Sequence, residues 1–309
     1  MDQAFTLGYT VTAKSTSRAT QNPPGNVPLK RYSGGKLNLA AINTGTDWVA
    51  RLTPTVSNPV SPTWSNGSYT PVTTSYQFTR PNTTVADTTW GPFEALNIGV
   101  AVDDAAGVGY AGETTTFTAP TPTSCQKSTS TECRKYASLT GGAVAKMRFG
   151  RLHMLNAYGS ELLPMRVPLR AEYSIGNNAW AVNTSDSCTA IAAGSLQLGN
   201  VVRLTNSNLT FATPAAGVAV TPLQSGLGYL TVTPSVKGAG SVDLVLNLGG
   251  SVGTTSCATL FAPAGGALPP TAIDYQAGNW CGVGYNKAPI ARIKFGSPKA
   301  PYIYLRERY

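Results

Sequence analysis

Residues 166–173 read Arg-Val-Pro-Leu-Arg-Ala-Glu-Tyr, and this stretch decides the fold class. Its odd positions are apolar or aromatic, whereas its even positions carry arginine, proline and glutamate. Successive side chains of a β-strand point to opposite faces of the sheet. Alternation over eight residues therefore predicts a strand with one face in a core and the other in water.

The same two-residue period recurs along the chain, in residues 5–13, 96–102 and 242–248. Clusters of Gly, Pro, Asn and Ser separate such runs, for example at 22–26, 57–66 and 176–178, and these residue types favour turns. We find no long stretch with the 3.6-residue period of a helix. The pattern predicts an all-β chain of tandem antiparallel β-sandwich modules, with an immunoglobulin-like architecture.

The composition is typical of an exported β protein. Charged residues make up 12% of the chain, and 32 glycines and 22 prolines accompany many Thr, Ser and Asn residues. The formal charge of +9 could attract nucleic acids, anionic glycans or lipid headgroups. The basic residues form no dense run and accompany no nucleic-acid-binding motif, so we interpret them as solvated strand faces and expect no nucleic-acid partner.

A stretch rich in Pro, Thr, Ser and Gly at 114–142 is the best candidate for a domain boundary. We therefore predict an N-terminal β-sandwich module at 1–118, a linker at 119–142 and a C-terminal module at 143–309. The loop Ala262–Thr271 is a second weak point, although it could equally be a long connection inside the C-terminal module.

Five cysteines occur without the paired CxxC spacing of a zinc site. Cys125 and Cys133 flank a short polar loop, and this spacing suits a local disulfide. Cys188, Cys257 and Cys281 remain, and the sequence does not indicate which two of them form a second bridge. Disulfides favour an export compartment.

The alternation changes phase within Arg148–Pro164, which reads RFGRLHMLNAYGSELLP. Met147 and Phe149 share one parity, whereas Leu152 and Met154 share the other. A β-bulge at Gly150 would return all four side chains to one face. The last eight residues, Tyr302–Tyr309, also alternate and predict a terminal strand that pairs within its own sheet, or alternatively is donated to a partner's sheet.

The sequence offers weak candidates for a catalytic or ligand site. His153 has no nucleophile or orienting carboxylate nearby in sequence, and Ser160 lacks the second glycine of a nucleophile elbow. An enzyme would need both residues to converge with a carboxylate, so we predict a non-enzymatic protein without cofactor or metal. Trp64 and Trp280 lie in loops and are the candidate contacts for a carbohydrate or protein ligand.

Several segments resemble the C-terminal region of the MSHA biogenesis protein MshQ family. They are Phe78–Asp103, Arg148–Leu169, Asp186–Thr189, Ala291–Gly296 and Tyr302–Tyr309. Two of them depart from the family phrases, because Arg292-Ile-Lys interrupts the first and Arg308 replaces a valine in the second. The resemblance marks ten residues as a fold signature: Arg148, Phe149, Gly150, Asn156, Tyr158, Gly159, Ser160, Glu161, Arg306 and Glu307.

The resemblance also implies a function and a location. Such proteins belong to operons for mannose-sensitive haemagglutinin pili, a class of type IV pilus, and often carry a secretion signal and a lectin-like sandwich. The partners implied are pilins or minor pilins, or glycans on a host or another surface. The N-terminus here has no signal-peptide pattern, and no apolar run is long enough to span a membrane. We therefore expect a fragment of a protein exported to the surface of a Gram-negative bacterium.

Overall fold

The computed structural model describes residues 1–14, 28–32, 36–53, 62–72, 75–81, 88–103, 116–118, 135–139, 145–211, 218–249, 257, 272–281 and 284–296. Within them the chain is all-β, as predicted, and the helical elements are short 3-10 turns. These turns are η1 (Val49–Arg51), η2 (Thr88–Trp90), η3 (Ala193–Ser195) and η5 (Asp274–Gln276). No helix in the described part of the chain is long and apolar enough to cross a membrane.

The chain divides into two compact units. The first comprises Met1–Pro81 and Thr89–Phe149, and the second comprises Asn82–Thr88 and Gly150–Tyr309. The boundaries expected at residues 118 and 143 differ from this division, which keeps residues 135–149 in the first unit. The Cys125–Cys133 loop and the terminal strand Tyr302–Tyr309, with Arg306 and Glu307, lie outside the described residues.

Among its described residues, the first unit contains three sheets. One has the order β1 (Ala4–Thr6), β7 (Ser75–Phe78), β5 (Leu52–Thr53), and a small one pairs β2 (Val11–Thr12) with β6 (Ser68–Tyr69). The largest has the order β4 (Thr46–Asp47), β3 (Lys36–Asn43), β8 (Phe93–Asp103), β10 (Lys135–Ser138), β9 (Thr116–Thr118), and β11 (Ala145–Met147) also pairs with β8. Leu52 and Phe78 pack with Leu96 and Ile98, so two of these sheets share a core.

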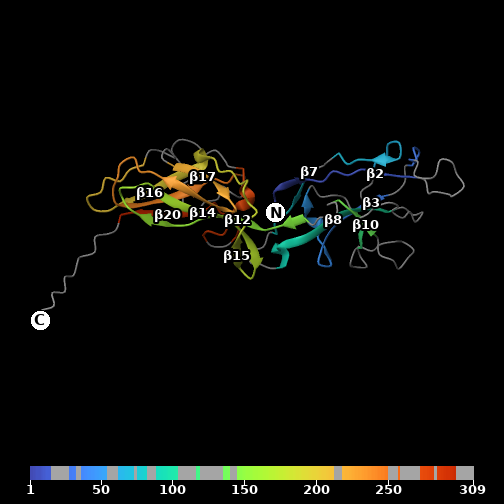
Figure 1. Ribbon diagram of the computed structural model, residues 1–309, viewed down its shortest axis with the longest axis horizontal. Helices are drawn as coiled ribbons and strands as arrows, with labels where there is room; N and C mark the ends of the chain where they lie inside the picture. The colour runs from blue at the N-terminus through green and yellow to red at the C-terminus, as the bar shows by residue number, and fades with distance from the viewer. Residues whose placement is uncertain are drawn as a thin grey trace. The chain divides into compact units, whose positions relative to one another are not determined.

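The second unit is a sandwich of two sheets (Figure 1). The first sheet has the order β12 (Gly150–Met154), β14 (Met165–Gly176), β18 (Leu227–Val232), β17 (Val218–Gln224), and β15 (Ala179–Val182) also pairs with β14. The second has the order β13 (Ala157–Gly159), β20 (Ile290–Phe295), β19 (Gly240–Leu246), β16 (Leu196–Arg203). We refer to them below as the β14 sheet and the β19 sheet.

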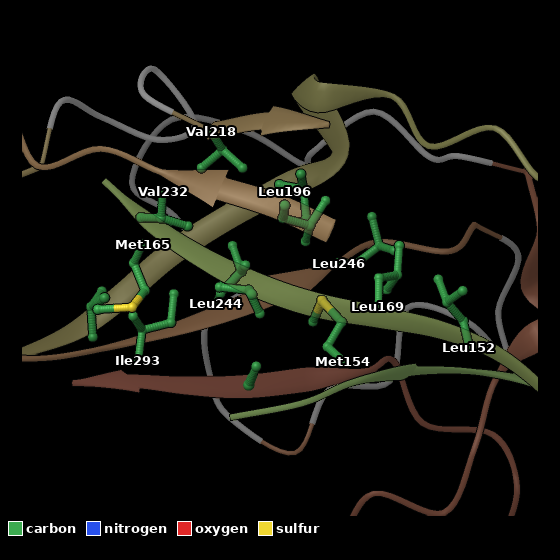
Figure 2. Close-up of a cluster of buried hydrophobic side chains, with 14 of the residues drawn as sticks. Leu152, Met154, Met165, Leu169, Leu196, Val218, Val232, Leu244, Leu246 and Ile293 are labelled. Atoms are coloured by element: carbon green, nitrogen blue, oxygen red, sulfur yellow. The ribbon is translucent and has the colours of Figure 1, made fainter. Parts of the chain in front are cut away.

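The core of the second unit lies between these sheets and follows the alternation seen in the sequence. Met165, Val167 and Leu169 of β14 face inward and are buried, whereas Arg166 and Arg170 are exposed. Figure 2 shows such side chains from the β14 sheet meeting Leu196, Leu244, Leu246 and Ile293 from the β19 sheet. The burial of these apolar side chains is the main favourable contribution to the packing of the two sheets.

The expected bulge at Gly150 is wrong. The strand ends at Met147, and a new strand begins at Gly150. Met147 packs against the core of the first unit, whereas Leu152 and Met154 are buried in the core of the second. The phase of the alternation changes because the two strands serve different cores, and no single face has to be maintained across them.

Candidate functional site

The first two signature residues stabilise the end of the first unit. Arg148 Nε donates to Glu94 Oε1 at 2.9 Å, and this hydrogen bond holds the pKa of Glu94 below its ordinary value. The Phe149 ring stacks on Trp90 with 4.2 Å between ring centroids. Both rings are buried, so Trp90 is a core residue.

The middle of the signature joins β13 to β20. Asn156 Oδ1 accepts a hydrogen bond from the backbone N–H of Arg292 at 2.7 Å, and Gly159 O accepts one from the N–H of Gly296 at 2.8 Å. The conformation of Gly296 is left-handed (φ +72°), and a Cβ there would lie 2.8 Å from Glu161 Oε2. Glycine is favoured here because of this backbone conformation and because the same Cβ would lie 2.9 Å from the Cβ of Ala239.

The remaining signature residues lie at the same turn. A Cβ on Gly159 would lie 2.9 Å from Met165 Cε, so the glycine allows that side chain to pack against the backbone. Ser160 Oγ accepts a hydrogen bond from the N–H of Leu162 at 3.1 Å, which closes the turn. Tyr158, by contrast, is 62% exposed. Six of the signature residues, Arg148, Phe149, Asn156, Gly159, Ser160 and Glu161, thus have contacts that stabilise the fold.

Asp186 organises the Asp-Ser-Cys-Thr element. Its Oδ1 accepts from the backbone N–H of Thr189 at 3.0 Å, and its Oδ2 accepts from the Thr189 hydroxyl at 2.7 Å. Gln276 Nε2 in turn donates to Thr189 Oγ1 at 3.0 Å. All three side chains are buried, so this element ties the loop after β15 to η5.

The disulfide left open by the sequence joins Cys257 to Cys281. Cys188 is a free and exposed thiol. The bridge therefore anchors the residue that follows Trp280, one of the two tryptophans proposed as ligand contacts.

The two candidate tryptophans lie in different units, and each is half-buried. Trp64 contacts the Tyr32 ring edge-on, with 4.8 Å between centroids, and the Tyr69 ring at 6.4 Å. Trp280 instead stacks on the imidazole of His153, with 4.7 Å between centroids. Each ring thus has aromatic neighbours in its own unit.

Trp280 belongs to a stacked cluster that sequence reasoning missed. We define the stacked cluster as Arg151 and His153 of β12, Glu172 of β14, Trp180 of β15, and Trp280. The Arg151 guanidinium carbon lies 3.8 Å from the centroid of the Trp180 ring and 4.9 Å from that of Trp280. A cation over an indole face is favourable, and more so when it is shielded from water.

The centre of the stacked cluster is the Glu172 carboxylate. Its Oε2 accepts from Arg151 Nε at 2.9 Å, and its Oε1 lies 3.0 Å from His153 Nδ1. Burial alone would raise the pKa of Glu172, but the hydrogen bonds from His153 and Arg151 outweigh it and hold the pKa below its ordinary value. The carboxylate is therefore a buried anion that is fully occupied by two neighbours.

Local sequence explains how the tryptophans reach Arg151. The turn between β14 and β15 has Asn177 and Asn178 at φ +50° and +59°, a two-residue hairpin loop that asparagine tolerates, and it brings Trp180 back beside β14. A Cβ on Gly278 would lie 2.6 Å from the indole of Trp280, so only glycine lets that ring lie flat against the backbone. The antiparallel register sets Arg151 opposite Glu172.

The arrangement expected of an enzyme is not formed among the described residues. His153 contacts Glu172 and Trp280, whereas Ser160 Oγ is used within its own turn. His153 lies in the β14 sheet, and Ser160 follows β13 of the β19 sheet. In the described part of the chain, no group of three or more His, Cys, Asp or Glu side chains could hold a metal ion.

Comparison with known proteins identifies one family. The model of the fourth domain of the DUF6701 family matches residues 148–308, just over half of the chain. No curated protein and no solved structure shows a significant match. The match starts two residues before Gly150, where the long segment of the second unit begins, so family and structure give nearly the same boundary there. The chain belongs to the DUF6701 family.

Proposed function

We propose that this chain is a non-enzymatic, extracellular component associated with an MSHA-type type IV pilus, in which it acts in pilus assembly or as a surface adhesin. One observation carries the proposal: the segment that resembles the MshQ family forms a sandwich whose signature side chains are used to stabilise the fold. A structural or adhesive module needs such a frame and no reactive centre. The DUF6701 match covers the same segment, but it assigns no function.

The direct test is made in the source bacterium. We expect deletion of the gene to reduce either the number of surface pili, counted by electron microscopy, or attachment measured in the same strain, and the wild-type gene should restore both. Loss of filaments would assign a role in assembly, and normal filaments with reduced attachment would assign an adhesin. If the deletion strain has normal filaments and normal attachment, the pilus proposal fails.

A carbohydrate-binding adhesive module unrelated to pilus assembly is the second candidate. It is favoured by the half-buried tryptophans, because Trp64 and Trp280 each leave part of an indole exposed to solvent, and indole faces stack on sugar rings. In this case the Trp64→Ala/Trp280→Ala double variant should lose retention on a glycan that the wild-type chain binds. A Trp64→Phe/Trp280→Phe variant, which keeps two aromatic faces, serves as the control. Unchanged retention by the alanine variant would exclude this candidate.

A further inference from the structure

The outward face of the β14 sheet is unusual in its charge. Its five strands contain five residues that can carry charge, namely Arg151, His153, Arg166, Arg170 and Glu172. β14 has β12 on one side and β18 on the other, so its outward side chains lie in the middle of the face. This sheet face therefore carries one carboxylate but three arginines and a histidine.

The one carboxylate on this face already has hydrogen-bond partners within the protein. Glu172 is buried and accepts hydrogen bonds within the stacked cluster, where it neutralises Arg151. Arg166 and Arg170 are exposed, and neither forms an ion pair with any residue that the structure describes. Arg170 also lies directly opposite His153 in the strand register, but the nearby Glu172 carboxylate pairs with Arg151 and His153 and not with Arg170.

The two exposed arginines depart from the usual arrangement of a protein surface. Protein surfaces usually intersperse charges of the two signs. The β19 sheet shows the ordinary solution, because Arg292 on its outer face pairs with Asp243 at 2.7 Å. The outward face of the β14 sheet lacks such a partner for Arg166 and Arg170 in the described residues, so its positive charge is available to a ligand.

The spacing favours an extended anion over a small one. Arg166 and Arg170 are four residues apart on one strand, so their Cα atoms lie about 13 Å apart. A single carboxylate or phosphate group is small compared with this spacing. A linear polymer with repeated negative groups can lie along the strand and contact both.

Tyr229 adds a surface suited to sugar rings. The Arg166 guanidinium carbon lies 4.6 Å from the centroid of the Tyr229 ring, which holds the cation over an aromatic face. Tyr229 is half-buried and lies opposite Pro168 in the register of β14 and β18. An aromatic ring beside a fixed guanidinium matches a pyranose ring that carries a carboxylate, because the ring can stack while the charge is paired.

We propose that the outward face of β14 and β18 binds an acidic polysaccharide, with Arg166 and Arg170 pairing its carboxylates and Tyr229 stacking on a sugar ring. The proposal rests on the extracellular location proposed above, but not on a role in the pilus. Nucleic acid fits less well, because tight binding to a phosphate backbone uses many more cations than two. A lipid surface fits less well because membrane-binding faces need a broad apolar side, whereas Ile175 and Leu227 are the two exposed large aliphatic residues among the described strands of this sheet.

The test is a binding measurement on the purified full chain with polygalacturonate, a polymer of one uronic acid, at about 0.15 M salt. We expect saturable binding that the Arg166→Gln/Arg170→Gln variant weakens by about tenfold or more. Tyr229→Leu should weaken it by a smaller factor. A Lys237→Gln/Lys294→Gln variant removes the same two charges from exposed positions outside the sheet, and it should bind like the wild type. Thermal melting of each variant establishes that it is folded.

Three results would overturn the proposal. The first is absence of binding of the wild-type chain to polygalacturonate, and the second is an equal loss in the two double variants, which would indicate attraction by net charge alone. The third is tighter binding to duplex DNA or to vesicles containing phosphatidylserine than to the polysaccharide. The pilus proposal is judged separately in the deletion strain, so either proposal can fail while the other stands.

Discussion

Each sheet of the second unit carries one buried carboxylate on its outer face, and the two differ in what covers them. Glu172 on the β14 sheet and Asp243 on the β19 sheet each pair with an arginine. The Arg151 side chain is 13% exposed, because Trp180 and Trp280 lie over it. The Arg292 side chain is 53% exposed to solvent.

The same carboxylate–arginine pair therefore has a different structural role in each of the two sheets. Asp243 joins neighbouring strands, since its oxygens accept from Arg292 on β20 and Asn200 on β16. Glu172 joins strands too, but the aromatic cover brings in the β15 hairpin and the segment held by the Cys257–Cys281 bridge. The stacked cluster thus joins segments from three parts of the chain, whereas the contacts of Asp243 link strands that are already neighbours in one sheet.

The largest effect is expected for Glu172→Gln. It would leave the covered guanidinium of Arg151 without an anion, and breaking a buried pair from one side costs about 4 kcal/mol of unfolding free energy. Chemical denaturation of the second unit measures this loss. A loss no greater than that of Asp243→Asn would contradict the distinction between covered and open pairs.

Removal of the disulfide by Cys257→Ser/Cys281→Ser should cost about 3 kcal/mol, because the bridge closes a loop of some 25 residues and restricts the unfolded chain. The same variant should increase the solvent accessibility of Trp280, which is measured by fluorescence quenching. Cys188→Ser, at a free and exposed thiol, is the matched control and should change neither quantity. Unaltered quenching in the double variant would mean that the bridge does not hold the indole in place.

Trp280→Ala should cost about 2 kcal/mol, less than a fully buried tryptophan, because the ring is half-buried but contacts both Arg151 and His153. Trp280→Phe keeps an aromatic face and should lose much less. The indole N–H has no hydrogen-bond partner among the described residues, so its removal adds no unpaired group. Equal losses in the two variants would show that ring stacking is not the source of the stability.

Asp243→Asn should have a smaller effect, about 1 kcal/mol, because the exposed Arg292 regains water when its partner becomes neutral. Denaturation under the conditions used for Glu172→Gln measures it. A loss of the same size as for Glu172→Gln would show that exposure of the arginine does not decide the cost.

The smallest effect is expected in the pH dependence of stability, compared between the wild type and Glu172→Gln. Burial raises the pKa of Glu172 and of Asp243, but hydrogen bonds outweigh burial and lower both. A carboxyl whose pKa is lower in the folded state stabilises the protein above its ordinary pKa, and this contribution is lost as the pH falls through the folded value. The wild type should thus lose more stability than Glu172→Gln as the pH is lowered below about 4.5. Parallel curves for the two proteins would show that Glu172 is not linked to folding.

Strand positions could be predicted from the sequence because a strand beside a core has an apolar side chain at every second residue. Val167, Leu169, Leu244 and Leu246 all lie where alternation placed them. The predicted strand across residues 5–13 is in fact two strands, β1 and β2, which pair with different partners. Alternation reports which way a side chain points, but it does not report the sheet to which a strand belongs.

The stacked cluster was beyond sequence reasoning for a related reason. Arg151 and Glu172 meet through the register of β12 and β14, and Trp280 arrives from a segment more than 100 residues away in sequence. No local pattern encodes that meeting. The two-residue spacing of Arg151 and His153 was the available signal, because it places both on one face of a strand.

The pairing of β13 with β20 has a mechanical consequence. The two strands run parallel, with Ala157 opposite Ile293 and Gly159 opposite Phe295. β13 lies near the start of the second unit and β20 near the end of its described part. Tension applied at Ala157 and at Phe295 in opposite directions would slide these strands along each other, so that their hydrogen bonds are strained together and are not peeled apart one by one. Such shear geometry slows forced unfolding, which is the relevant measure of stability for a protein that bears load.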